Sequence, residues 1–159
     1  MACRPARRLA AQLLLLFAGM APGLSQEAIP ASAEDGLRVH VAFRSFELLG
    51  ERCGVETGDV AGHADASFEW VARNDHARHL ANVVLDYHAV VPEPADIEAT
   101  AEAEFAATRA GTTSTLAELC AFFLGGVHEG RFDLNELDAP LWDRLLESDR
   151  MITEARRAP

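Results

Sequence analysis

Apolar residues recur at helical spacing through the middle of the chain. After residue 65 they fall at multiples of three and four residues, at Phe68, Val71, Leu80, Val84, Tyr87 and Val91. Pro92 and Pro94 end this pattern, because proline lacks the N–H that continues a helix. The spacing predicts one long helix over 65–90, with Asp65 or Ser67 as its cap.

The segment after Pro94 predicts a surface helix with one narrow buried edge. Its apolar positions, Ile97, Ala101 and Phe105, are four residues apart, and most of the others are alanine, glutamate and threonine. Gly111 is expected to end this helix, since glycine is common just past a helix C-terminus.

Two further helices are predicted toward the C-terminal end. Thr115 and Glu118 have the spacing of a capping box, and the helix that they open is apolar over much of its girth. We therefore expect this helix to be the central one of the core. Asp138 followed by Pro140 is typical of a helix start, where proline leaves no partner unsatisfied. The last residues, 154–159, are expected to form a frayed tail.

The first element, over 35–50, is ambiguous between helix and strand. Residues 37–43 alternate between apolar and polar side chains, as a strand does. Residues 46–49 do not alternate, and no second convincing strand exists with which an isolated strand could pair. We predict a helix, followed by a glycine-rich loop over 50–62.

The first 25 residues have the pattern of a signal peptide. Three arginines precede an apolar stretch over 9–21, which is shorter than the roughly 20 residues that span a bilayer. Gly23 and Ser25 provide the small side chains needed before a cut after Ser25, and a cut after Ala21 is the alternative. We expect a periplasmic or secreted protein with no stable membrane insertion after cleavage. A disordered lead-in over 26–34 and a single helical domain over 35–153 would follow.

The chain is acidic, with a net charge of −11 and no lysine among its 14 basic residues. Losing the three arginines of the leader would leave 11 basic residues against 25 acidic ones, a net charge of −14. Such a surface repels nucleic acid and anionic lipid, which excludes those partners. An acidic surface could attract cations or a basic partner. The alternative is that the charges only keep the protein solvated.

Two cysteines remain after the leader, which contains Cys3. In an oxidising compartment, an even pair formed by Cys53 and Cys120 is most simply a disulfide. A redox-active pair is the alternative, but catalytic pairs usually have a close C-x-x-C spacing, whereas these two are 67 positions apart. A structural disulfide requires their Cα atoms to lie within about 7 Å of each other.

A pair of histidines is the first candidate for a site. His76 and His79 are three residues apart on the predicted second helix, so both side chains leave one face and could share a divalent metal. No third ligand follows at a defined spacing, and the alternative is a polar, exposed helix face. No other cofactor is expected.

A second candidate is the group formed by Trp70, Arg73 and Asn74. An aromatic ring, a guanidinium and an amide within one helical turn could form a recognition face. Alternatively, the three residues support the loop over 50–62, with Arg73 donating hydrogen bonds to its carbonyl groups.

Catalytic motifs are missing from the sequence. It contains no G-x-S-x-G elbow, no S-x-x-K, no H-E-x-x-H and no phosphate-binding loop after a strand. Acidic residues gather at Glu98, Glu102 and Glu104 and again over 133–138. A small hydrolase that uses an acid pair therefore stays open as an alternative.

Several short motifs resemble those of a known group. The first cysteine of the pair precedes a helix that reads FEWVARN over 68–74, a later helix reads LAELC over 116–120, and GRFDL follows over 130–134. In these features the chain resembles a loose group of small, uncharacterised, all-helical secreted or periplasmic proteins of proteobacteria. Val60 and Gly62 stand in the segment where members of that group usually carry a proline. The resemblance implies a helical fold and a paired cysteine, and no agreed activity.

The sequence thus predicts an all-α protein, a compact irregular bundle of four or five helices with a Cys53–Cys120 disulfide. The favoured function is a non-enzymatic envelope protein that binds a partner protein or a small ligand through a helix face. The alternatives are a metal-binding protein that uses His76 and His79 and a small hydrolase.

Overall fold

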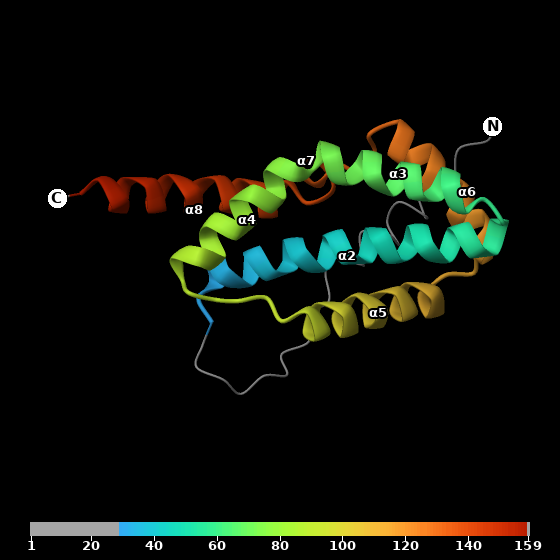
Figure 1. Cartoon of the computed structure of the whole chain (residues 1–159), viewed down its shortest axis with the longest axis horizontal. Coiled ribbons are helices and arrows are strands. Elements are labelled where there is room, and N and C mark those ends of the chain that lie inside the picture. Colours follow the sequence, from blue (N-terminus) through green and yellow to red (C-terminus); the bar gives the residue numbers. More distant parts are fainter. Residues whose placement is uncertain (1–28, 159) are drawn as a thin grey trace.

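A computed structural model of the chain describes residues 29–158, and all regular secondary structure in that range is helical. The helices in chain order (Figure 1) are α2 (Ala31–Thr57), α3 (Val60–Arg73), α4 (Asp75–Tyr87), α5 (Pro94–Gly111), α6 (Leu116–His128), α7 (Leu134–Leu137) and α8 (Ala139–Arg157). The all-α prediction is confirmed. These seven helices exceed the expected four or five because one predicted helix is broken in two and α7 is an additional single turn. The leader expected over 1–25 lies outside the described residues.

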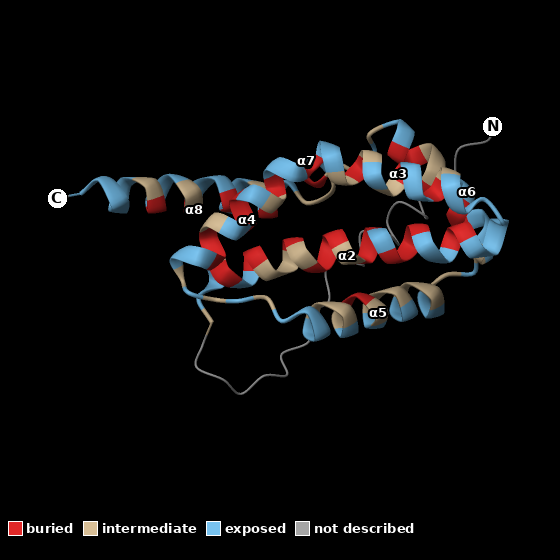
Figure 2. Ribbon diagram, viewed as in Figure 1, coloured by how far each residue is buried: buried red, intermediate tan, exposed pale blue. Residues whose placement is uncertain are grey.

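Helix α2 forms the centre of the bundle. It contacts α3, α4, α5, α6 and α8, and in Figure 1 it runs between α5 on one side and α3 with α4 on the other. Buried residues occur along its whole length (Figure 2). The expectation that the helix opened by Thr115 is central was therefore wrong. That helix, α6, packs against α2 and α3. Its Cys120 meets Cys53, which lies near the C-terminal end of α2.

The central position of α2 explains the ambiguous pattern of its first half. Residues 37–43 are helical, yet Val39, Val41 and Phe43 are all buried. A helix that packs against one neighbour buries a single stripe, whereas a helix surrounded by several neighbours buries residues on more than one side. The alternation of 37–43 thus arises from helical residues that face different partners.

Helix α2 also begins earlier than expected. It starts at Ala31, so the prediction of disorder over 26–34 was wrong for residues 31–34. Ala33 is fully buried, and Asp35 accepts two hydrogen bonds from Arg144 of α8, at 2.7 and 2.8 Å. This bidentate ion pair ties the N-terminal part of α2 to α8.

The glycine-rich segment over 50–62 is mostly helical instead of a loop. Helix α2 continues to Thr57, and Gly58 ends it with a φ of 73°, a left-handed conformation that glycine adopts without steric penalty. Asp59 then caps α3 by accepting a hydrogen bond from the N–H of Gly62 at 3.0 Å. The connection between α2 and α3 is therefore a tight turn over 58–59.

The helix predicted over 65–90 is interrupted at Asn74, which separates α3 from α4. Leu80 and Val84 are buried as expected. Phe68, Tyr87 and Val91 were assigned to the same stripe, and that assignment was wrong, because all three side chains are exposed. The buried positions of α3 and α4 include Ala66, Trp70, Ala77, Leu80, Ala81 and Val84.

The remaining helices follow their local signals. Ala101 is the buried position of α5, and Thr115 and Glu118 form the complete capping box of α6. Asp138 accepts a hydrogen bond from the N–H of Leu141 at 3.0 Å and so caps α8. That helix continues to Arg157, so the expected frayed tail is helical over 154–157, and α8 projects beyond the bundle in Figure 1. None of the described helices is long and apolar enough to cross a membrane.

A carboxyl group is partly buried between α5 and α2. The Ser45 hydroxyl on α2 donates a hydrogen bond to Glu104 Oε2 on α5 at 3.2 Å. Burial raises the pKa of Glu104 to about 7, although the Ser45 hydrogen bond and the positive charge of Arg38 both favour the carboxylate. Folding therefore stabilises the protonated form of this side chain.

We predict that Glu104 makes the protein less stable as the pH rises toward neutrality. Because the pKa in the folded protein lies above the unfolded value of about 4.5, its contribution is fully present below pH 4.5 and is lost as the pH rises through about 7. The free energy of unfolding in urea, measured between pH 5 and pH 8, should fall more for the parent protein than for Glu104→Gln. Other groups titrate equally in both proteins, so parallel pH curves would contradict this assignment.

Candidate functional site

The two histidines proposed as metal ligands lie on the surface. His76 and His79 are both exposed on α4, and the ring of His76 packs edge-on against Trp142 of α8, with 5.4 Å between the ring centroids. Within the described residues, the group of three side chains placed to hold a metal ion consists of Cys53, His63 and Cys120. Neither surface histidine belongs to that group.

Trp70 belongs to the core and not to a recognition face. It is 0% exposed, its ring stacks on Phe46 at a centroid distance of 3.8 Å, and Phe43 meets it edge-on at 4.9 Å. The indole N–H donates a hydrogen bond to the carbonyl oxygen of Phe132 at 2.7 Å. The largest aromatic side chain of α3 is therefore satisfied inside the protein.

Arg73 and Asn74 continue the same connection toward the segment between α6 and α7. Arg73 donates hydrogen bonds to the carbonyl oxygen of Val127 at 2.5 Å and to Asp133 Oδ1 at 3.0 Å. The buried Asn74 side chain donates to the carbonyl oxygen of Trp70 and accepts from the N–H of Leu134, both at 2.8 Å. Trp70, Arg73 and Asn74 thus support another segment of the protein and do not form a recognition face. The segment that they support is 127–134 and not the predicted loop over 50–62.

The acidic clusters considered for hydrolysis take part in ion pairs that link elements of the bundle. Glu98 and Glu102 on α5 bind Arg44 and Arg52 of α2. Asp133 binds Arg73, and Asp138 binds Arg38 at 3.1 Å. These side chains stabilise contacts between elements distant in sequence.

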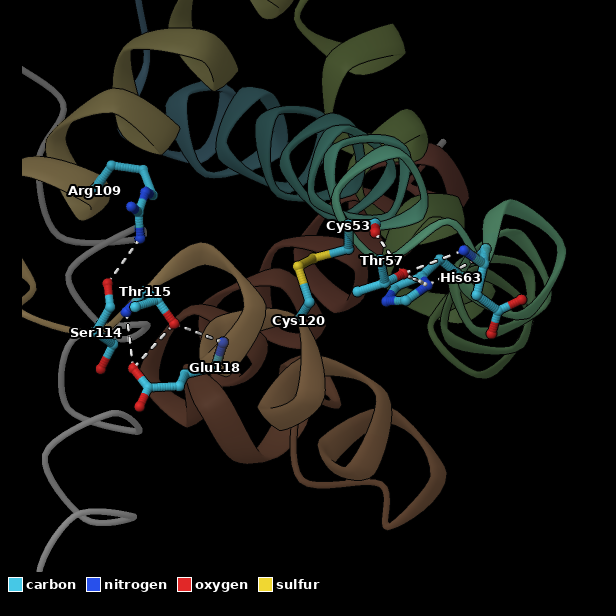
Figure 3. The surroundings of a disulfide bond; sticks show 9 residues. Cys53, Thr57, His63, Arg109, Ser114, Thr115, Glu118 and Cys120 are labelled. Atoms are coloured by element: carbon cyan, nitrogen blue, oxygen red, sulfur yellow. Dashed lines mark hydrogen bonds between the residues drawn. A yellow bond between two sulfur atoms is a disulfide. The ribbon is translucent and has the colours of Figure 1, made fainter.

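The two cysteines meet where α6 packs against the end of α2 (Figure 3). The Sγ atoms of Cys53 and Cys120 lie 2.10 Å apart and the Cα atoms 5.2 Å apart, which places the pair at disulfide distance and within the predicted limit. Both residues are 0% exposed. The bond therefore connects the central helix to α6 inside the core.

His63 on α3 completes this buried cluster. A ring nitrogen of His63 and the two sulfur atoms all lie within 4.8 Å of one another. The ring Nδ1 is 2.9 Å from the carbonyl oxygen of Asp59, so Nδ1 is the donor of that hydrogen bond. Nε2 is buried and has no hydrogen-bond partner. A buried nitrogen without a hydrogen-bond partner is destabilising, so an unpartnered Nε2 in a ring next to two sulfur atoms requires an explanation.

The opposite face of α3 carries an exposed apolar stripe. Val60, Ala64 and Phe68 are spaced by four residues and therefore lie on one side of the helix. Val60 is 64% exposed and Phe68 is 76% exposed. A single exposed apolar side chain is common on protein surfaces, whereas three aligned ones form a continuous contact surface. We refer to these three residues as the α3 stripe.

A shallow hollow lies between the α3 stripe and α2. Its volume is about 240 Å³, and it is lined by Val60, Ala64 and Ser67 from α3 and by Glu47, Gly50 and Glu51 from α2. The two helices approach closely beneath it, because a Cβ atom on Gly50 would lie only 2.0 Å from Ser67 Oγ. This contact explains why glycine occupies position 50 of a helix.

The α2 side of the hollow carries excess negative charge. Arg44 forms ion pairs with Glu47, Glu51 and Glu98, so one guanidinium faces three carboxylates. The Glu47 and Glu51 side chains remain 47% and 60% exposed. Next to the α3 stripe there is therefore an acidic rim that is only partly neutralised within the protein.

Sequence reasoning missed both of these features. His63 lies only at a helix entrance when the sequence is read alone, and no spacing rule connects it to cysteines 10 and 57 positions away. The exposure of Phe68 follows from the burial of Ala66 and Trp70 on another side of α3. The four-residue spacing of Val60, Ala64 and Phe68 was the available signal, but it does not say which side of the helix is buried.

Comparison of the chain with protein-family models, with curated proteins and with solved structures finds no match. The functional assignment therefore depends on the geometry of this chain.

We predict that Asn74→Ala lowers the free energy of unfolding by about 1–3 kcal/mol, because it leaves the buried N–H of Leu134 without its acceptor. Urea unfolding measures the difference. His79→Ala is the matched control on the adjoining helix, since His79 is exposed, and it should change stability by less than about 0.5 kcal/mol. Equal stability of the two variants would contradict the supporting role of Asn74.

We also predict that removing the disulfide lowers stability by about 4 kcal/mol, since the bond closes a loop between residues that are 67 positions apart. The comparison is between the parent protein and the Cys53→Ser, Cys120→Ser double variant in urea unfolding without reductant. Adding a phosphine reductant should destabilise the parent and leave the double variant unchanged. A double variant as stable as the parent would show that the bond does not contribute.

Proposed function

We propose that the protein is a non-enzymatic module of the cell envelope, which binds a basic amphipathic helix of a partner protein along the α3 stripe. The single observation that supports this proposal most strongly is the exposure of Phe68, which is 76% accessible on a helix whose other face is packed in the core. Aromatic side chains are enriched at the centres of protein interfaces because they bury a large apolar area.

The chemistry of the partner follows from the surroundings of the stripe. An apolar face on the partner would cover Val60, Ala64 and Phe68, and basic side chains at its edge would meet Glu47 and Glu51. The net charge of −11 attracts a basic segment from a distance and accelerates association. An acidic or uncharged helix would gain only the apolar contact.

A helix fits the hollow better than a small molecule does. Small-molecule sites usually enclose about 300–1,000 Å³ and bury most of the ligand. The hollow beside the α3 stripe has about 240 Å³ and is open to solvent. Side chains of a helix at positions i, i+3, i+4 and i+7 can lie across such an open groove, as in other helix-in-groove complexes.

We predict that Phe68→Ser weakens binding of a designed amphipathic peptide, with leucines on one face and arginines on the other, by about tenfold or more. Burying a large apolar side chain contributes about 1.5–3 kcal/mol, and 1.4 kcal/mol corresponds to a factor of ten. Isothermal titration calorimetry or fluorescence anisotropy gives the dissociation constants.

Two controls make this test specific. Val91→Ser removes a side chain that is 75% exposed away from the stripe and should leave the dissociation constant unchanged. A peptide in which glutamates replace the arginines should bind more weakly than the basic peptide. The proposal fails if the basic peptide does not bind, if both variants lose affinity equally, or if the two peptides bind with equal affinity.

A further inference from the structure

The buried cluster on the inner face of α3 has a feature that a structural disulfide does not require. Cys53, Cys120 and His63 are each 0–1% exposed, and their ligand atoms lie within 4.8 Å of one another. His63 Nε2 has no hydrogen-bond partner. A neutral imidazole whose Nδ1 donates to the carbonyl oxygen of Asp59 carries its free lone pair on Nε2.

We propose that, when Cys53 and Cys120 are in the dithiol form, these two residues and His63 bind one thiophilic d¹⁰ cation, Zn(II) or Cu(I). The three side chains offer two thiolates and one imidazole, the donor types that such ions prefer. The disulfide and the metal complex exclude each other, because the same sulfur atoms make both sets of bonds. This site is independent of the α3 stripe and of the proposed function.

The hydrogen bond made by the other ring nitrogen of His63 supports the proposal. Histidines that bind metals usually donate their other ring N–H to a carboxylate or a backbone carbonyl, which fixes the ring and directs the free nitrogen at the ion. The hydrogen bond from His63 Nδ1 to Asp59, at 2.9 Å, is of this kind. Asp59 also caps α3 through its side chain, so the helix start and the ring orientation depend on the same residue.

The ligand number and the charge distinguish the two ions. With two thiolates, Zn(II) gives an uncharged complex, which favours it in a buried place, but structural zinc sites usually need a fourth ligand. Cu(I) is satisfied by three ligands, and its complex would keep one negative charge. The described residues place three ligands here, so binding of Zn(II) would require a water molecule in the fourth position.

The test uses the full chain with Cys3→Ser, so that Cys53 and Cys120 are its two thiols. A water-soluble phosphine reduces the disulfide: the bond takes up two electrons and two protons, and the phosphine gains the oxygen of one water molecule. Zn(II) and Cu(I) are then added separately under anaerobic conditions, and binding releases the two thiol protons to solvent. Native mass spectrometry counts the bound ions, and thermal unfolding reports the effect on stability.

We expect the reduced chain to bind one equivalent of at least one of the two ions and to unfold at a higher temperature with it. The disulfide form should gain neither the ion nor the thermal shift. His63→Gln should bind the ion at least about tenfold more weakly, since changes to the shell that merely orients a ligand already reduce affinity 10–100-fold. His79→Ala is the control for a histidine on the surface.

The parent protein alone already gives a decisive result, which guards against a His63→Gln variant that fails to fold. If the reduced parent binds neither ion in a 1:1 complex, or if the ions shift the unfolding of the reduced and disulfide forms equally, the proposal is overturned. It is also overturned if His63→Gln folds with its disulfide formed and, after reduction, binds the ion as tightly as the parent.

Discussion

The structure depends above all on the burial of Trp70 between the central helix and the segment that joins α6 to α7. Its ring stacks on Phe46 of α2 at 3.8 Å, and its indole N–H bonds the carbonyl oxygen of Phe132. A buried indole without that acceptor would be destabilising, so the position of Phe132 is set by the same side chain that fills the core. The carbonyl oxygen of Trp70 in turn accepts a hydrogen bond from the side-chain NH₂ of Asn74. The side-chain oxygen of Asn74 accepts a hydrogen bond from the backbone N–H of Leu134. Trp70 and Asn74 thereby connect the C-terminal half of α3 to α2, at Phe46, and to the segment over 132–134.

Features that depend on neighbouring residues could be predicted from the sequence. The capping box at Thr115 and the Asp138 cap before Pro140 involve partners within three positions, so the residue types alone specify the hydrogen bonds. The pairing of Cys53 with Cys120 was also predictable, because the leader was expected to remove the remaining cysteine. Its close Cα distance agrees with that reasoning.

Features that depend on packing partners could not be predicted in this way. The ion pair near the N-terminal end of α2 joins Asp35 to Arg144, two residues that are 109 positions apart. The break at Asn74 is explained by the N–H of Leu134, which attracts its side chain from another part of the chain. Which side of α3 is exposed depends on the packing of Trp70 against Phe46. Periodicity alone predicts an apolar stripe on a helix without showing whether that stripe is buried.

Helix α3 carries two chemically different surfaces on different sides of the helix. His63, Ala66 and Trp70 point into the core, and Val60, Ala64 and Phe68 point to solvent. The two helices approach closely beside the turn over 58–59, since a Cβ atom on Gly54 would lie 3.0 Å from the Cα of Val60. The same helix thus contributes His63 to the buried cysteine cluster and Phe68 to the exposed stripe, and the two proposed sites are independent of each other.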